Sequence, residues 1–481
     1  MRPAGRYIVR CGVVALGLML SGCASFSELQ SADAKIATAW HAALPHDGHV
    51  SNLESWWSTF NDPSLTALIG HAEAENPSLD SSIADIEKAR ATLASARASL
   101  FPSLSGSGSV SGSGTSGDTV NRIEAGTTSS GGLDASWEID LFGKNRQKSE
   151  AARQRIGEEV ADWHDARVSL AAEVADDYVQ YRACRQIENA YSVELASQRD
   201  TIRATETAAS SGLTSTSDLA LARASAASSS STLTEQRAEC EVLVKSLAEL
   251  TGGDEIRVRQ LLAKGKNDIP TPKNLRIAAV PAAALRQRPD IGALEQEVAA
   301  TVADVGAAKA DLYPSLSLSG SLTVSGSTAT GASLPWSFGP SLTIPLLDGG
   351  SRSAAVESAI ADYNKAVAKY KSGVLSAISD IETDLVRVDS TRKRIGDAAT
   401  AASNYRTYFN SIDTNWKAGG ASLLDREEAR RSAQSAEITL IEVRRDAVRY
   451  WIALYKALGG GWDLKPSAPA PEKTKAQGTL L

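Results

Sequence analysis

The side chains that could carry chemistry are few and scattered along this chain. Five histidines occur, and none of them stands beside both a nucleophile and a carboxylate in the sequence. Catalysis needs such groups within hydrogen-bond reach of one another, so the sequence gives poor support for an enzyme. His41, His46 and His49 lie near the N-terminus, and imidazole is a common metal ligand. Because their stretch has little periodicity, we interpret them as solvated side chains and expect neither a metal nor a cofactor.

The first cysteine chemistry that the sequence predicts is lipid attachment near the N-terminus. Three arginines precede a short apolar run, which ends in Leu20-Ser21-Gly22-Cys23. Residues 1–22 have the pattern of a signal peptide, because the apolar run is too short to span a membrane. The last four residues resemble a bacterial lipobox, which implies cleavage before Cys23 and a covalent lipid on its thiol. Ala24 follows the cysteine, and a neutral residue there resembles the sorting rule for the outer membrane.

A second pair of cysteines could form a disulfide. Cys184 and Cys240 each lie 28 residues from Gly212, so a chain reversal at Gly212 would bring them to the same level. Export to an oxidising compartment permits a disulfide. Equal level does not make the side chains face each other, because neighbouring helix axes lie roughly 8–10 Å apart. The sequence therefore leaves open a disulfide or two unpaired thiols packed as small apolar groups.

The elements that position these residues are organised around a phrase that occurs twice, at 98–105 and at 310–317. In each copy a proline ends an Ala-rich helical stretch and an alternating polar and apolar segment follows. Each such segment has a return partner, and the four predicted strands are 103–115, 131–142, 315–326 and 336–347.

Strands of this length can cross a bilayer as a tilted β-barrel. Four strands cannot close a barrel, and an open edge in lipid would leave backbone groups without hydrogen-bond partners. The strands of several chains must therefore combine. The alternative is two amphipathic hairpins on a soluble domain, for which faces rich in serine and glycine would make a weak core.

Long helices make up most of the remaining chain. Each half consists of a helix, two strands, a long helix, a glycine turn and a shorter helix, which indicates an internal duplication. Apolar residues between Val356 and Val388 are spaced by threes and fours, the pattern of coiled-coil packing. The formal net charge of −7 disfavours a nucleic-acid partner.

These features divide the chain into six parts. Besides the signal peptide, we predict a lipidated arm with an equatorial segment, a first repeat with its turn at 212, a linker, a second repeat with its turn at 419, and a disordered tail. The expected bounds are 23–79, 80–253, 254–284, 285–461 and 462–481.

Taken together, the motifs resemble the outer membrane factor family, the TolC-like channels. The most specific ones are the lipobox, the repeated phrase, Trp137-Glu138-Ile139-Asp140-Leu141-Phe142-Gly143 and Arg288-Pro289-Asp290-Ile291. The chain looks closest to the lipoprotein branch that serves resistance-nodulation-division (RND) efflux systems, the NodT-type outer membrane efflux lipoproteins. The resemblance covers essentially the whole mature chain.

The resemblance implies a homotrimer in the outer membrane, anchored by its lipid and extending into the periplasm. Three chains with four strands each would form one transmembrane β-barrel of twelve strands, continued by a long α-helical coiled-coil barrel. A periplasmic adaptor (membrane fusion protein) would link this channel to an inner-membrane RND transporter. The implied function is the passage of small toxic solutes or drugs to the exterior, with no covalent chemistry. Phe101 and Tyr313 would lie at the membrane interface.

The resemblance also implies roles at the periplasmic end. Asp425 and Glu428 would form a charged constriction, the periplasmic gate. The hairpin tips would comprise Gly212, Asp218, Trp416, Gly419 and Gly420. The alternative for Asp425 and Glu428 is that acids in the first turn of a helix offset its dipole and stay solvated. Since Ala421 stands where some relatives have an arginine, we expect this gate to depend more on packing than on ionic links.

Two rival functions remain at this point. The outer membrane channel of a type I protein secretion system shares the same fold. A structural periplasmic coiled-coil lipoprotein would suit the helices but leaves the four alternating strands unexplained. Neither the exported solute nor the adaptor is identified by the sequence.

Overall fold

The computed structural model describes residues 32–34, 40–42, 56–116, 123–272, 284–327 and 331–460. The predicted signal peptide, Cys23, His46, His49 and the predicted tail therefore lie outside the described residues. Residues 273–283 of the predicted linker also lie outside the described residues.

Both halves of the chain contain the same sequence of helices and strands. The elements of the first half are η2 (Trp56–Phe60), α2 (Pro63–Glu75), α3 (Pro77–Ala98), β1 (Ser103–Ser116), β2 (Ile123–Ile139), α4 (Lys144–Ser210), α5 (Thr216–Leu250) and α6 (Glu255–Lys264). The elements of the second half are α8 (Pro289–Ala310), β3 (Ser315–Ser327), β4 (Gly331–Ser333), β5 (Trp336–Thr343), α9 (Ser351–Lys417) and α10 (Leu423–Ala457).

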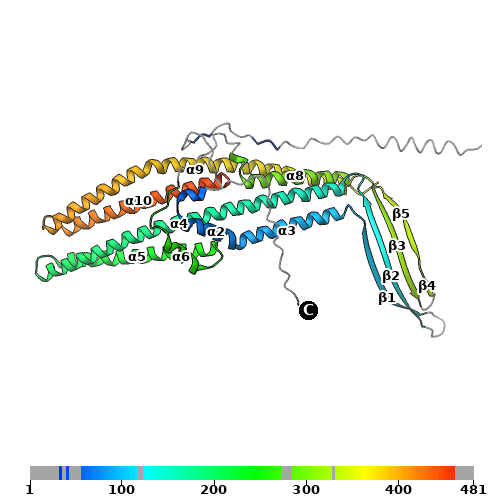
Figure 1. Cartoon of the computed structure of the whole chain (residues 1–481), viewed down its shortest axis with the longest axis horizontal. Coiled ribbons are helices and arrows are strands. Elements are labelled where there is room, and N and C mark those ends of the chain that lie inside the picture. Colours follow the sequence, from blue (N-terminus) through cyan, green and yellow to red (C-terminus); the bar gives the residue numbers. More distant parts are fainter. Residues whose placement is uncertain are drawn as a thin grey trace, which may run out of the picture.

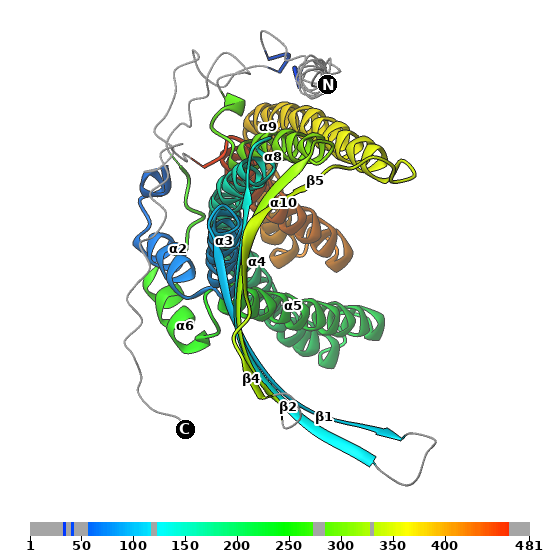
Figure 2. The same ribbon diagram turned by 90° about the vertical axis from the view of Figure 1, so that its right-hand side faces the viewer.

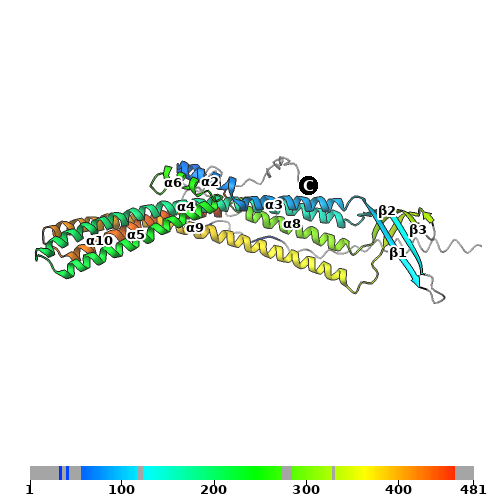
Figure 3. The ribbon, with the colours of Figure 1, turned by 90° about the horizontal axis from the view of Figure 1, so that it is seen from below.

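The helices form one elongated body with the strands at one end (Figure 1). α4 and α9 have 67 residues each and are therefore about 100 Å long. α3 and α5 pack along successive parts of α4, while α8 and α10 do the same along α9. α8 and α10 also pack against α4, so this helix joins the two halves (Figure 3).

The main apolar core lies in the middle of the body. There η2 and α2 pack against the central parts of α4 and α9 and the C-terminal part of α10, and Trp56 stacks on Tyr455 with ring centroids 4.7 Å apart. Asp62 caps α2 and accepts a hydrogen bond of 2.6 Å from the Tyr178 hydroxyl. α2 and α6 lie on one side of the body, and α5 and α10 lie on the other (Figure 2).

The strands form one antiparallel sheet in the order β1-β2-β3, and β3 also pairs with β4 and β5. The register places apolar side chains of neighbouring strands opposite one another, for example Leu133 beside Leu322 and Leu322 beside Trp336. Ser105, Asp134 and Ser321 are aligned in the same way on the other face. The sheet therefore has one apolar and one polar face. The apolar face is exposed: Leu104, Val110, Trp336 and Phe338 each have about 70% or more of their surface accessible.

The strand bounds differ from those predicted. β2 begins at Ile123, eight residues before the expected 131, because the Ser, Thr and Gly residues read as a loop pair with β1 as far as Ser116. β5 ends at Thr343 rather than at 347, because its partner strand β3 begins opposite at Ser315. Backbone pairing, which side-chain composition does not reveal, sets both limits.

The predicted linker contains a helix that the sequence analysis did not anticipate. α6 begins after Asp254, whose carboxylate accepts a hydrogen bond of 3.0 Å from the Arg257 N–H. Val258 and Leu262, four residues apart, are buried against the main core. Nearby prolines led us to expect an irregular segment here, but the cap and the apolar pair are sufficient for a short helix. No helix in the described ranges is long and apolar enough to cross a membrane.

Candidate functional site at the hairpin tips

The two hairpin turns lie side by side at the end of the body away from the sheet (Figure 1). Gly212 and Gly419 adopt the left-handed conformation, with φ of 69° and 78°, which few residues other than glycine adopt readily. The Leu213 N–H donates to the Ala208 carbonyl, and the Gly420 N–H donates to the Asn415 carbonyl. Each glycine therefore ends a long helix and reverses the chain.

A capping box begins the return helix at each turn. The Ser215 hydroxyl accepts a hydrogen bond from the Asp218 N–H, and the Asp218 carboxylate accepts one from the Ser215 N–H. Ser422 and Asp425 repeat this arrangement at the start of α10. Hydrogen bonds from Ser422 hold the pKa of Asp425 below its usual range, so this exposed carboxylate is ionised at neutral pH.

The structure places both predicted gate residues on the exposed surface of α10. Asp425 has a local structural role as the capping partner of Ser422, equivalent to that of Asp218 in the other hairpin. Glu428 has no hydrogen-bond or ion-pair partner among the described residues, and Leu221 occupies the corresponding place in the first hairpin. The helix cap therefore accounts for Asp425 without a gate, whereas nothing in the fold of one chain requires the Glu428 carboxylate.

Behind these exposed acids lies a buried ionic network that the sequence analysis missed. The Arg426 guanidinium donates to Asp413 of α9 at 2.6 Å and to the Thr201 hydroxyl of α4 at 2.7 Å, and it lies over the Trp416 ring at 4.6 Å. Arg430 lies between Glu427 of its own helix and Glu194 of α4. The network joins the second hairpin to the first.

The charges of this network are deeply buried. Side-chain exposure is 3% for Arg430, 5% for Glu427 and 8% for Glu194. Burial raises the pKa of Glu194 and of Glu427 and lowers the pKa of Arg430, even though each group has an opposite charge nearby. Arg430 Nε is 3.0 Å from Glu194 Oε1 without hydrogen-bond geometry, and Arg430 Nη1 has no hydrogen-bond partner among the described residues. The desolvation of these ions is therefore only partly offset.

The expectation that the gate depends more on packing than on ionic links stays a prediction, because this network lies within one chain. Within one chain, Arg426 and Arg430 make the ionic links for which Ala421 gave no signal. The spacing of Arg426, Glu427 and Arg430 on one turn of α10 is the local feature of this network, and the sequence analysis drew no inference from it. Their burial depends on contact with α4, more than two hundred residues earlier, and no local pattern reveals that contact.

A disulfide joins Cys184 of α4 to Cys240 of α5. The Cα atoms are 5.7 Å apart, within the usual range for a bridge. Of the two arrangements that the sequence left open, the structure contains the bridged one. It links the two helices of the first hairpin just outside the main core, which includes Val179 of α4 and Val244 of α5.

The predicted interface aromatics lie where the helices meet the sheet. Phe101 is 69% exposed, and Tyr313 stacks on Phe142 with ring centroids 4.8 Å apart. Nearby, Leu346 and Leu347 are 89% and 95% exposed. An exposed apolar belt therefore continues from the sheet onto this junction.

The described residues give no support for a metal centre. No group of three His, Cys, Asp or Glu side chains among them could hold a metal ion. His41 uses its backbone N–H to bind the Glu382 carboxylate, at 2.6 Å.

The fold and the exposed apolar sheet define a class: channel proteins of the outer membrane. Comparison with protein families identifies one family, described as outer membrane efflux protein, whose model matches residues 68–253 and 280–460. The chain belongs to this family, and it is an outer membrane efflux protein rather than an enzyme.

Curated relatives and solved structures agree with this assignment. Nodulation protein T of Rhizobium leguminosarum bv. trifolii is 28% identical over 93% of this chain and 96% of its own length. Outer membrane protein OprJ of Pseudomonas aeruginosa is 29% identical over 94% of this chain and 96% of its own length. The Campylobacter jejuni CmeC outer membrane channel is 25% identical in sequence and superposes with a TM-score of 0.82, covering 91% of this chain and 95% of CmeC.

Proposed function

We propose that three copies of this chain form one channel, with a twelve-stranded transmembrane β-barrel continued by a coiled-coil barrel of helices. The observation that carries this proposal is the open sheet. Among the described strands, β1 pairs with β2 alone and β5 with β3 alone, so an edge at each side of the sheet has unpaired backbone groups. Such edges promote association with further strands, and in lipid they must be paired. Pairing β1 of one copy with β5 of the next closes the barrel.

The two faces of the sheet support the same arrangement. The apolar face, with Leu133, Leu322 and Trp336 in one row, suits lipid, and the Ser, Thr and Asp side chains of the other face suit a water-filled lumen. On α9, Leu375, Val386 and Tyr408 are apolar or aromatic side chains more than half exposed in the single chain. Neighbouring copies would cover them.

The channel would act within a tripartite system. We infer that its hairpin tips contact a periplasmic adaptor, which connects it to an inner-membrane RND transporter. The names of two relatives favour small organic solutes, since one is a pyoverdine export protein, OpmQ, and another a toluene efflux pump protein, TtgI. We therefore favour small toxic solutes or drugs over a secreted protein as the cargo.

The course of the N-terminal arm supports lipid attachment at Cys23. Ala32 packs near Tyr363 of α9, while Trp40 and Ala42 pack against the main core further from the sheet. Ala32 therefore lies nearer the sheet end than Trp40 does. From Tyr363 to the start of α9 the distance is about 18 Å, and the nine Cα–Cα steps from Ala32 to Cys23 can span at most about 30 Å. A lipid on Cys23 can therefore reach the membrane level.

The periplasmic gate would comprise the exposed carboxylates of Asp425 and Glu428. Three-fold symmetry would stack two rings of three acids, which favours cations. Since Asp425 also caps α10, the Glu428 carboxylate is the better test. Glu428→Gln keeps the cap and the side-chain shape, so a changed conductance would come from the lost charge.

The experiment measures the trimer first and the gate second. Detergent-extracted protein should migrate as a heat-labile trimer, and migration only as a monomer would contradict the closed barrel. In planar bilayers, Glu428→Gln and Asp425→Asn together should change single-channel conductance and reduce cation preference. Asp218→Asn is the matched control, because it alters the same capping box in the other hairpin. Equal effects of control and test variants would remove both acids from the gate.

A further inference from the structure

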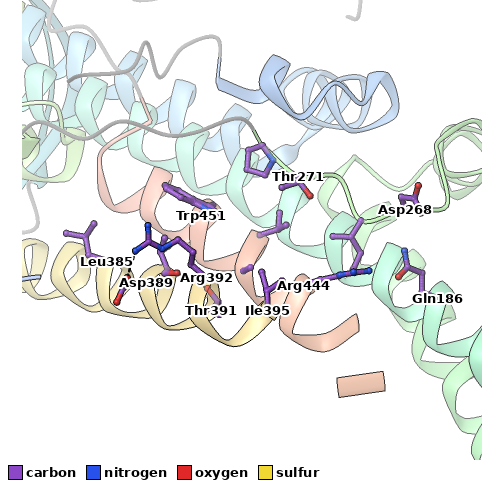
Figure 4. Close-up of a pocket in the computed structure, with 15 residues that line it drawn as sticks. Gln186, Asp268, Thr271, Leu385, Asp389, Thr391, Arg392, Ile395, Arg444 and Trp451 are labelled. Carbon is purple, nitrogen blue, oxygen red and sulfur yellow. Dashed lines mark hydrogen bonds and ion pairs between the residues drawn. The ribbon is translucent and has the colours of Figure 1, made fainter. Parts of the chain in front are cut away.

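A cavity of about 590 Å³ lies near the middle of the body, away from the hairpin tips. Its walls come from α4, α9 and α10, and the segment 268–272 that follows α6 covers it (Figure 4). This segment follows a helix on the side of the body opposite α5 (Figure 2). The cavity has the volume of a site for a drug-sized molecule.

One wall of the cavity is apolar. Val448 and Trp451 of α10 and Leu385 and Val388 of α9 contribute side chains, and Ile269 contributes from the covering segment. Val448, Leu385 and Val388 belong to the main core, so this wall is rigid. An apolar molecule in the cavity would lie against a preformed surface.

The charged side chains in the lining are not equivalent. Asp389 is neutralised locally, because Arg392 donates to one of its oxygens at 3.0 Å and Lys393 to the other at 2.5 Å. Arg444 has no hydrogen-bond or ion-pair partner among the described residues, although it lies beside the apolar wall. Asp268 is likewise without such a partner in the described part of the chain, and Figure 4 shows it at one end of the cavity.

We propose that this cavity binds an amphiphilic organic anion, with its apolar body against Trp451 and Val448 and its acidic group paired with Arg444. Apolar contact supplies the affinity, and a guanidinium recognises a carboxylate or sulfonate through paired hydrogen bonds. Asp268 repels a second acidic group, so monoanions are favoured over dianions. This cavity is separate from the proposed gate at the hairpin tips, and binding there does not depend on the gate.

The cavity adjoins both hairpins, because α4 belongs to the first and α9 and α10 belong to the second. A ligand there contacts both at once and binds only the packed state. Binding therefore stabilises the junction of the hairpins, and the gain rises with the logarithm of the free ligand concentration once this exceeds the Kd.

The test uses anilinonaphthalene sulfonate, an aromatic monoanion, with the full-length trimer in lipid nanodiscs. Fluorescence titration of the wild type, corrected with empty nanodiscs, should show saturable binding. Arg444→Gln should weaken it about tenfold or more, as expected for a lost charge-assisted hydrogen bond. Asp268→Asn should tighten it, whereas a site for cations would respond in the opposite direction to both changes.

Two further variants keep the proposal open to refutation. Ala447→Phe fills the cavity without changing charge and should abolish saturable binding, and Arg444→Lys should retain part of it. Arg431→Gln is the matched control, since it removes one exposed α10 charge outside the cavity and should leave binding unchanged. Trimer migration and helix content identify any variant that fails to fold. Wild-type affinity in Arg444→Gln or in Ala447→Phe would overturn the proposal, as would absence of saturable binding in the wild type.

Discussion

At the scale of single residues, the buried charges near the tips dominate the energetics. Arg430 is 3% exposed and faces the carboxylates of Glu194 and Glu427. Burial shifts the pKa of all three groups more than the attraction of their partners does. Desolvation of the charges therefore offsets much of the free energy gained by pairing them, and removing one partner costs still more free energy. Removal of one member leaves its partners charged and unpaired.

Arg430→Met should therefore destabilise the protein by about 3–5 kcal/mol. Adding Glu194→Gln should restore part of the loss, because it removes one of the stranded charges. Differential scanning calorimetry of the purified trimer measures both effects. Arg431→Met is the control, since Arg431 is the exposed neighbour. Equal transition temperatures for Arg430→Met and Arg431→Met would show that the network is not buried in the assembled protein.

Glu158 of α4 gives a pH-dependent prediction. Burial, and then repulsion from Glu297 and Asp162, raises the pKa of Glu158 to about 7. The folded state therefore holds this proton more tightly than the unfolded chain does. The stability that this proton on Glu158 contributes is complete below the unfolded pKa of about 4.5. It is lost as the pH rises through the folded pKa of about 7.

Glu158→Gln removes the ionisation and should make the protein more stable than wild type at pH 8, with no gain at pH 4. Because Glu158 is partly exposed and water screens its charge, we expect a gain of about 0.5–1 kcal/mol. Thermal unfolding at the two pH values measures the difference. Glu87→Gln, on the exposed surface of α3, should show no such pH dependence. A gain that is the same at both pH values would contradict the assigned cause.

The residue scale is also where prediction from the sequence failed most. Gly212 and Gly419 were predictable as turns, because glycine after a long helical stretch has a local cause. Arg426 and Arg430 were not, because their burial comes from the packing of α10 on α4. Charged residues on a helix are solvated unless another element covers them, and periodicity alone does not indicate which face is covered.

At the scale of elements, the disulfide affects the first hairpin. Between the main core and the tip, α4 and α5 share a small apolar cluster that includes Leu195, Ala226 and Leu233. The bridge between Cys184 and Cys240 closes a loop with a sequence separation of 56, which corresponds to about 4 kcal/mol in the chain-entropy account.

Reduction of the disulfide should lower the unfolding temperature of the wild type. It should have no effect on a variant with Cys184→Ala and Cys240→Ala, which is the control for other effects of the reductant. Mass spectrometry of alkylated, unreduced protein provides an independent measurement. Labelling of both thiols in that sample would show that the bridge is absent from the isolated protein.

The order of the elements was largely predictable, and their limits were less so. Alternation over ten or more residues predicted the strands, but the first part of β2 looked like a loop because serine, threonine and glycine are typical of loops. Its residues form a strand because β1 lies beside them, with Ser116 opposite Ile123. A partner strand can determine structure where side-chain propensity is neutral.

At the scale of the whole molecule, the sheet and the proposed lipid on Cys23 would be two separate means of membrane attachment. The apolar face of the sheet, closed by three copies, would contact the bilayer over its full thickness. Acyl chains on one cysteine would contribute less, since lipid anchors do not approach the insertion of a membrane-spanning element. The barrel should therefore determine location, and the lipid should assist.

Cys23→Ser, exported with a cleavable signal peptide of the ordinary kind, tests this division. The variant should still appear as trimers in the outer membrane fraction, because the sheet of each chain retains its apolar face and its two open edges. Density-gradient fractionation and trimer migration measure the outcome. The wild-type protein with the same tag is the control for export. Recovery of the Cys23→Ser variant as soluble periplasmic protein would show that the lipid, not the barrel, holds the protein in the membrane.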